Sequence, residues 1–255
     1  MKRGRILGIG LGVTLASLAG TQRAWADNST VLEVRQPDAG RSPQNFAMEV
    51  RVALYNPQVD SDSSLHGDPY AQAFGPSQRY EVGAEFDWQV LRIPHLGTLG
   101  PGIGIGYTKS TAIAPRTDGG QPPSEETTSL QIFPMYAVAV LRVDVLMREA
   151  HVPFVPYAKA GLGYALWRAS NTAGTSSQNG LLGEGHTLGT QLAAGLAFSL
   201  GVIDPNSSRQ LDESTGINNT YIFAEYMMSD LTGIGQSHAL WVGSNSFVFG
   251  LAFEF

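Results

Sequence analysis

Apolar and polar residues alternate at every second position in several long segments of this chain. The clearest segment starts at Arg79: its even positions from Tyr80 to Val90 are apolar, whereas Glu81, Glu85 and Asp87 occupy odd positions. Successive side chains of a strand point to opposite faces, so this segment predicts a strand with one apolar and one charged face. It is longer than the five or six residues of an average strand and suits a tilted strand that crosses a membrane.

The same alternation recurs often enough to predict a whole sheet. Eight segments carry it, at residues 45–55, 79–90, 102–108, 128–141, 154–167, 188–199, 220–228 and 246–255. An even number of long alternating strands indicates an all-β fold, a closed antiparallel up-and-down transmembrane β-barrel of eight strands, with ten as the nearest alternative. A soluble β-sandwich is the competing fold, because it too can expose one polar face.

The fourth segment is the least regular. Leu130, Ile132, Tyr136, Val138 and Val140 share one face, which we expect to point to the lipid like the apolar faces of the other segments. Pro134 interrupts this face and predicts a bulge or another irregularity, because proline cannot donate a ladder hydrogen bond.

The connections between the segments alternate in length. Residues 56–78, 109–127, 168–187 and 229–245 form long polar loops, and 92–101 and 142–153 are shorter. If both termini face the periplasm, the four long loops are extracellular. The connection 201–219 is longer than the other inner turns, and Asp204-Pro205 predicts a helical turn there.

The N-terminus has the features of a secretory signal. Three cations precede an apolar run of 14 residues, Ile6 to Ala19, and a small-residue site at residues 24–26 follows. That run is shorter than the roughly 20 residues of a membrane-spanning helix. We expect a signal peptide at residues 1–26 that is cleaved after Ala26, a periplasmic lead-in at 27–44 and a barrel at 45–255.

Charge and composition exclude several classes of protein. Cleavage after Ala26 would remove four of the 16 Lys and Arg and none of the 22 Asp and Glu, so the formal net charge would fall from −6 to −10. Such an acidic chain argues against a nucleic-acid partner. The absence of cysteine excludes disulfides and thiol chemistry. The mature part has no apolar run of 18 residues, which excludes a helical membrane protein.

The polar faces of the strands predict a charged barrel interior. An eight-stranded barrel is just wide enough for side chains to fill, so inward charges must neutralise one another. Arg51 and Lys159 are the cations expected inside. The acids that share this predicted lumen network are Glu49, Glu81, Glu85, Asp87, Glu225 and Glu254. Because the acids outnumber the cations, some of them must be hydrated or protonated.

The last strand carries the most specific motif. It ends in Phe255, with Phe253 two residues and Gly250 five residues before the end. This pattern resembles the C-terminal strand that the barrel-assembly machinery recognises, although Val248 stands where a polar residue is commoner. The resemblance implies that the assembly machinery, periplasmic chaperones and the lipid of the outer membrane are the partners of the chain.

Further motifs resemble a family of outer-membrane β-barrel proteins from myxobacteria and their relatives. They are Ser42-Pro43-Gln44-Asn45-Phe46, Glu85-Phe86-Asp87-Trp88, Leu91-Arg92-Ile93-Pro94-His95-Leu96-Gly97 and Phe223-Ala224-Glu225-Tyr226. The resemblance covers essentially the whole mature chain and implies an outer-membrane location. It implies no biochemical activity.

Candidate chemistry is sparse. A lipid-modifying enzyme would need a histidine near the outer rim beside a serine or carboxylate. His66, His186 and His238 lie in or beside the predicted outer loops, whereas His95 and His151 lie in inner turns, and none forms a His-x-Ser pattern within a strand. We therefore expect no enzyme, and solvated loop histidines.

Two other motifs are weak. Asp60-Ser61-Asp62 with Asp68 lacks the Gly and Glu positions of an EF-hand loop, so an acidic solvated loop is expected and no metal site. The glycines at 102, 104 and 106 alternate inside a strand, so they suit a narrow barrel better than a phosphate loop, and no cofactor is expected.

The sequence thus favours an outer-membrane scaffold that presents four extracellular loops. A narrow pore or carrier for small solutes is the alternative, and a rim-located lipid-modifying enzyme is the third hypothesis.

Overall fold

The computed structural model describes residues 44–113, 126–178, 181–236 and 239–255. The expected signal peptide, and the lead-in except for Gln44, lie outside these residues, as do Ser42 and Pro43 of the family motif and His238. Among the described residues, no helix has the length and hydropathy needed to span a membrane.

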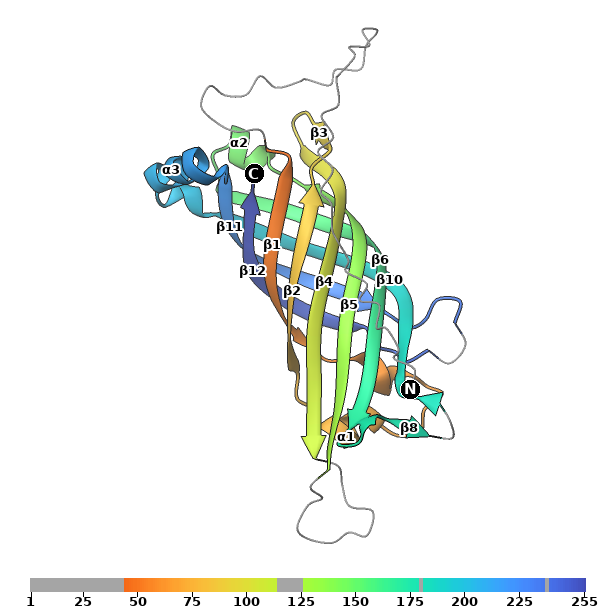
Figure 1. Ribbon diagram of the computed structural model, residues 1–255. Helices are drawn as coiled ribbons and strands as arrows, with labels where there is room; N and C mark the ends of the chain where they lie inside the picture. The colour runs from red at the N-terminus through yellow and green to blue at the C-terminus, as the bar shows by residue number, and fades with distance from the viewer. Residues whose placement is uncertain (1–43, 114–125, 179–180, 237–238) are drawn as a thin grey trace, which may run out of the picture. The chain divides into compact units, whose positions relative to one another are not determined.

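Eight long strands form one closed antiparallel barrel (Figure 1). Each pairs with the next along the chain, β6 pairs directly with β10, and β12 pairs with β1 to close the ring. A closed ring leaves no backbone edge without a partner. The strands are β1 (Phe46–Tyr55), β2 (Arg79–Trp88), β4 (Gly97–Ile113), β5 (Thr127–Arg142), β6 (Phe154–Asn171), β10 (Glu184–Ser199), β11 (Asn219–Asp230) and β12 (Ser244–Glu254). The prediction of eight strands is confirmed.

Short strands lie in two of the connections, between β2 and β4 and between β6 and β10. β3 (Leu91–Ile93) pairs with β4, β7 (Gly174–Thr175) pairs with β6, and β8 (Ser177–Gln178) pairs with β9 (Leu181–Leu182). Several long strands also exceed their predicted bounds: β4 begins five residues before the alternating segment at 102–108 and ends five residues after it.

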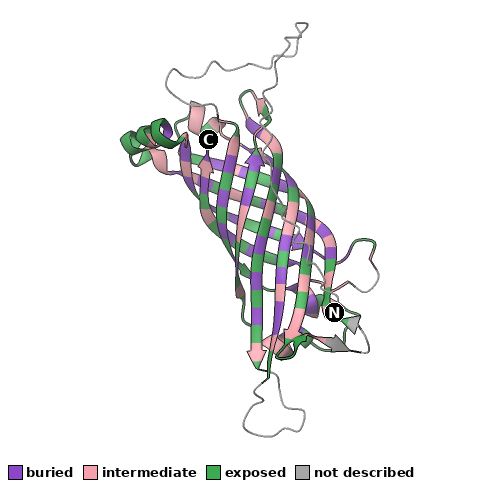
Figure 2. Cartoon of the chain, viewed as in Figure 1, coloured by how far each residue is buried: buried purple, intermediate pink, exposed green. Residues whose placement is uncertain are grey.

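The barrel has an apolar outer wall. Buried and exposed residues alternate along each strand (Figure 2), and the exposed set consists mainly of large apolar side chains. Ile103, Leu162 and Phe249, for example, are 63%, 59% and 53% exposed. Hundreds of square ångströms of contiguous apolar surface are unfavourable in contact with water. A wall of this kind is therefore stable only in contact with lipid.

Aromatic side chains lie near both ends of this wall. At the end where the barrel's termini meet, Phe46 stacks on Phe86 and Trp88, with ring centroids 5.5 and 6.3 Å apart. Near the other end, Tyr107 contacts Phe133 and Tyr226 contacts Phe247, with centroids 5.0 and 5.1 Å apart. Two aromatic belts are the usual interface anchors of membrane barrels.

Strand β5 faces the opposite way from the sequence prediction. Leu130, Ile132, Val138 and Val140 are buried inside the barrel, and Phe133 is exposed on the wall. Both faces of this strand are apolar, so alternation alone could not orient it.

The strand register explains the orientation of β5. Tyr136 pairs with Gly104 on one side and Gly163 on the other, and a Cβ atom at Gly104 would lie 2.1 Å from the Tyr136 ring. The bulky side chains of β5 thus fill the interior where neighbouring glycines leave room, as expected for the glycines of β4. Near Pro134 the pairing of β4 with β5 is interrupted between the residue pairs Ile105–Met135 and Thr108–Ile132. The register is the same on both sides of this interruption, so no residue is inserted.

The two ends of the barrel differ. The inner end, where β12 finishes, carries β3, α2 (Val145–Glu149), η2 (Leu200–Val202) and α3 (Pro205–Thr215), and the outer end carries η1 (Gln58–Ser61) and α1 (Pro69–Phe74) (Figure 1). The predicted helical turn is therefore an 11-residue helix, α3. Its cap is Asp204, whose carboxylate accepts hydrogen bonds from the N–H groups of Asn206 and Ser207.

Asp60 has a structural role in the first outer loop. Its two carboxylate oxygens accept hydrogen bonds from the backbone N–H groups of Tyr70 and Ala71, at 2.6 and 2.9 Å. Asp60 thus fixes the start of α1. The sequence instead predicts a solvated acid at this position.

Candidate functional site

A buried charge network crosses the middle of the barrel. We use the name central network for the charged side chains Glu49, Arg51, Glu85, Asp87, Arg142, Lys159 and Glu225, all of them buried. Arg51 forms ion pairs with Glu85 and Glu225 and also bonds the Tyr136 hydroxyl. Its guanidinium therefore joins β1 to β2, β5 and β11.

Lys159 lies at the centre of the network. Its Nζ is 2.8 Å from Glu49 Oε2, 2.7 Å from Glu85 Oε1 and 3.3 Å from Glu225 Oε2. The ammonium also lies over the Tyr157 ring, 5.0 Å from its centroid. One cation thus holds three carboxylates that belong to three different strands.

Arg142 is the network residue that the sequence analysis missed. Its Nη2 donates to Glu49 Oε1 at 2.7 Å and to Asp87 Oδ2 at 2.8 Å. The sequence predicts an inner turn that begins at residue 142, but β5 continues through this residue, which shares the inward face with Val138 and Val140. Alternation along β5 would have placed Arg142 inside the barrel if the orientation of this strand had been known.

The network holds four carboxylates against three cations. Oxygens of Glu49, Glu85 and Asp87 lie within 4.8 Å of one another, a spacing that a metal ion could bridge. In this structure Arg51, Arg142 and Lys159 neutralise those oxygens instead. Removing one partner of such a buried pair leaves a charge uncompensated, which is strongly destabilising.

Two predicted members of the lumen network form no salt bridge with the described residues of the central network. Glu81 is buried towards the outer end, and its Oε2 has no hydrogen-bond partner among the described residues. Glu254 is buried at the inner end, where Gln44, Gln89 and Tyr221 donate hydrogen bonds to its carboxylate.

An apolar cluster fills the outer end of the lumen. Val59 from η1 and Tyr70 from α1 pack with the inward strand residues Leu130 and Ile132. The Tyr70 hydroxyl is 2.6 Å from Ser110 Oγ. The whole outer cluster consists of Tyr55, Val59, Tyr70, Leu130, Ile132, Ala165, Leu231 and Val242. The lumen is therefore filled by the charged side chains of the central network in its middle and by this apolar cluster at its outer end.

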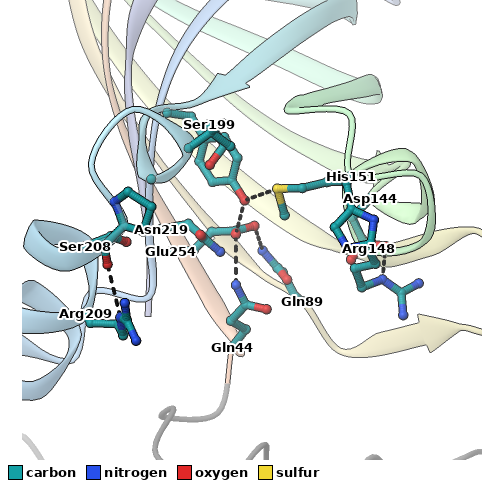
Figure 3. A pocket seen from close by; sticks show the side chains of 15 residues that line it. Gln44, Gln89, Asp144, Arg148, His151, Ser199, Ser208, Arg209, Asn219 and Glu254 are labelled. Atoms are coloured by element: carbon teal, nitrogen blue, oxygen red, sulfur yellow. Dashed lines mark hydrogen bonds and ion pairs between the residues drawn. The ribbon is translucent and has the colours of Figure 1, made fainter.

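The inner end contains a cavity of about 500 Å³, which we call the inner vestibule (Figure 3). Glu254, Tyr221 and Asn219 line it from the strands, while α2, η2 and α3 form its rim. Its lining residues are Gln44, Gln89, Asp144, Met147, Arg148, His151, Ser199, Gly201, Val202, Pro205, Ser208, Arg209, Asn219, Tyr221 and Glu254. Most of these side chains are polar, so the inner vestibule suits a hydrophilic ligand.

The described histidines lie towards both ends of the barrel. His66 is exposed in the first outer loop, and His186 is exposed on the outer wall, where it stacks on Tyr164. At the inner end, His95 Nδ1 is 2.9 Å from Glu149 Oε1, and His151 lines the inner vestibule.

The three residues of the expected assembly signal lie on the last strand or just after it. Gly250 faces inward, and a Cβ atom there would lie 2.1 Å from the Val50 carbonyl oxygen. Phe255 packs against Phe46 with ring centroids 6.1 Å apart, and its backbone pairs with that of Phe46. Phe253 is partly buried on the wall. Gly250 is therefore required by packing, independently of any recognition.

Comparison with known proteins gives structural likenesses only. No protein-family model matches the chain, and no curated protein matches it. OprG from Pseudomonas aeruginosa is 10% identical with a TM-score of 0.45, over 85% of this chain and 98% of that one. Neisserial surface protein A is 12% identical with a TM-score of 0.43, over 82% and 97% of the two chains. Ail, the attachment invasion locus protein of Yersinia pestis, is 13% identical with a TM-score of 0.42, over 83% and 97%.

Strand pairing and the outer wall define the class of protein. A closed eight-stranded ring with an apolar exterior, two aromatic belts and charged groups inside is a transmembrane β-barrel of the bacterial outer membrane. The narrower resemblance to the myxobacterial family stays a prediction.

Proposed function

We propose that this protein is a non-conducting outer-membrane scaffold that presents four extracellular loops and catalyses no reaction. The observation that carries the proposal is the filled lumen. Lys159 and Arg51 bond carboxylates from across the barrel, and Tyr70 and Val59 pack into its outer end. A solute would have to break buried ion pairs and displace an apolar cluster to pass.

Planar-bilayer recording of the refolded protein tests this proposal. Folding is verified first by heat-modifiable gel migration, because folded barrels resist detergent until they are boiled. We expect no discrete current steps from the folded protein. Regular steps from a heat-modifiable preparation would refute the scaffold and support a pore.

The second candidate, a narrow pore or carrier for small solutes, is favoured by the inner vestibule. This polar cavity of about 500 Å³ already occupies one end of the lumen. Inward hydroxyl groups also line the wall towards the outer end, among them Thr108, Ser110 and Ser246. Transport would require the central network to rearrange.

The third candidate is a lipid-modifying enzyme at the outer rim. Alanine substitution of His66, His186 and His238 tests it, with release of fatty acid from outer-membrane lipid as the readout. We expect no such activity in the parent protein and therefore no effect of the substitutions.

The partners that follow from this function are those of any outer-membrane barrel. We infer that periplasmic chaperones and the barrel-assembly machinery handle the chain through its last strand, and that outer-membrane lipid covers the wall. The acidic composition gives no reason to expect nucleic acid.

A further inference from the structure

We propose that the inner vestibule binds a small zwitterion, an amino acid or a short peptide, with its ammonium group at Glu254 and its carboxylate at the arginines of the rim. The inference goes beyond the scaffold function and does not depend on whether the lumen conducts. It rests on the separation of charge within this one cavity.

Glu254 forms the acidic side of the vestibule. Its residue is only 7% exposed, and its carboxylate accepts hydrogen bonds from Gln89 Nε2 at 2.7 Å, Tyr221 Oη at 2.7 Å and Gln44 Nε2 at 3.3 Å. All three donors are neutral, and Glu254 forms no ion pair with any residue in the described ranges. A buried carboxylate whose direct hydrogen-bond donors are all neutral can accept a further, charged donor from a ligand ammonium.

The two glutamines add acceptors beside this carboxylate. Gln44 and Gln89 both use their amide nitrogen on Glu254. Their amide oxygens make no hydrogen bond to another described residue. Two carbonyl oxygens and a carboxylate form an acceptor set that matches the three N–H donors of an ammonium group.

The rim of the same cavity is basic. Arg209 and Arg148 lie on opposite sides of Glu254 in Figure 3, and His151 lies near Arg148. Asp144 is already shared between Arg148 and Arg92, at 2.8 and 3.1 Å. Arg209 bonds only the Pro205 carbonyl and the Asn206 side chain, so no carboxylate of the described residues neutralises it. The rim thus carries positive charge that can bind an anionic group.

The dimensions of the cavity restrict the ligand. A volume of about 500 Å³ lies within the range of small-molecule sites. The central network and the outer cluster close the lumen beyond Glu254, so a ligand enters from the inner end. Barrels of this class have short turns on the periplasmic side and longer loops outside the cell. We therefore assign the inner end to the periplasmic side.

Calorimetric titration of the refolded protein with dialanine tests the proposal. The protein is kept in a sugar-headed detergent, because zwitterionic detergents would compete for the site. We expect dialanine to bind, and N-acetyl-dialanine and dialanine amide to bind at least about tenfold more weakly, since each lacks one of the two charges. Equal affinity of dialanine and its N-acetyl form, or no binding of dialanine, would overturn the proposal.

Substitutions test whether dialanine binds in the inner vestibule, in addition to the comparison of ligands on the unaltered protein. E254Q should weaken dialanine binding about tenfold or more, and R148Q/R209Q should weaken it while leaving the amide form unaffected. E213Q is the matched control, because Glu213 is exposed on α3 and does not line the cavity. If E254Q fails to become heat-modifiable, the comparison of the three ligands on the unaltered protein still decides the question.

Conductance and binding give independent answers. Current steps combined with dialanine binding would refute the scaffold and keep the vestibule site. A silent barrel that does not bind dialanine would keep the scaffold and refute the site.

Discussion

Lys159 reaches across the barrel to Glu49, with 2.8 Å between Nζ and Oε2. Their strands, β6 and β1, stand opposite each other in the ring, four strands apart in either direction. An ion pair between opposite strands can form only if the lumen between them is occupied by the two side chains themselves. The pair therefore indicates both how narrow the barrel is and why its middle is filled.

Removal of the Lys159 charge should destabilise the barrel. Lys159→Ala leaves Glu49, Glu85 and Glu225 with one cation fewer in a buried site, so we expect a loss of about 3–5 kcal/mol in the free energy of unfolding. Urea titration in lipid vesicles measures it. Lys109→Ala is the matched control, because Lys109 is exposed on the outer wall, and it should change stability by less than about 0.5 kcal/mol. Equal effects of the two substitutions would show that the network adds no stability.

The close packing of Gly104 against Tyr136 predicts a coupled pair. Gly104→Ala places a methyl group 2.1 Å from the Tyr136 ring, so the substitution should cost about 1–3 kcal/mol. In a Tyr136→Ala background the obstruction is gone, and Gly104→Ala should then cost much less. A double-mutant cycle from urea unfolding measures this coupling, and additive costs would show that the ring moves aside freely.

The sequence predicted the strands whose two faces differ chemically. In β2 the acids Glu81, Glu85 and Asp87 share one face, so burying the opposite face in lipid is the only arrangement that avoids charges in the membrane. The helical turn at Asp204 was also predictable, because its cap and Pro205 are local signals. Local chemistry thus decided both features.

The orientation of β5 and the role of Arg142 were not predictable in this way. Both faces of β5 are apolar, and the glycines that make room for Tyr136 belong to β4 and β6. The inner vestibule depends on the same kind of information, since residues from β12, α2 and α3 meet only after the ring has closed. These features depend on which residues of different strands lie side by side. Alternation along a single strand does not determine that.

The cap of α3 should respond to acid. Hydrogen bonds from the Ser207 side chain and backbone N–H lower the pKa of Asp204 below its usual value. A lowered folded-state pKa means that the charged cap stabilises α3 above the unfolded pKa of about 4, and that this contribution is lost as the pH falls through the folded pKa. Amide hydrogen exchange within α3 should therefore accelerate there, relative to the strands.

Asp204→Ser is the control for this titration. Serine keeps an oxygen that accepts from the N–H groups of the first turn but carries no titratable charge. The exchange rates of α3, measured relative to the strands, should then be independent of pH across the same range. If the parent protein shows the same flat profile, the charge of Asp204 does not contribute to the helix.

Phe255 should matter more for assembly in cells than for folding in detergent. Phe255→Ala keeps the backbone pairing with Phe46 but removes the terminal ring that resembles an assembly signal. Phe249→Ala removes the same ring from the exposed wall of the same strand and serves as the matched control. We expect both variants to refold into detergent micelles, whereas the amount of heat-modifiable protein in the outer-membrane fraction should fall several-fold for Phe255→Ala alone. Equal amounts of the two variants in that fraction would remove the assembly role of Phe255, because each substitution removes one phenylalanine ring and the two differ in where that ring lies.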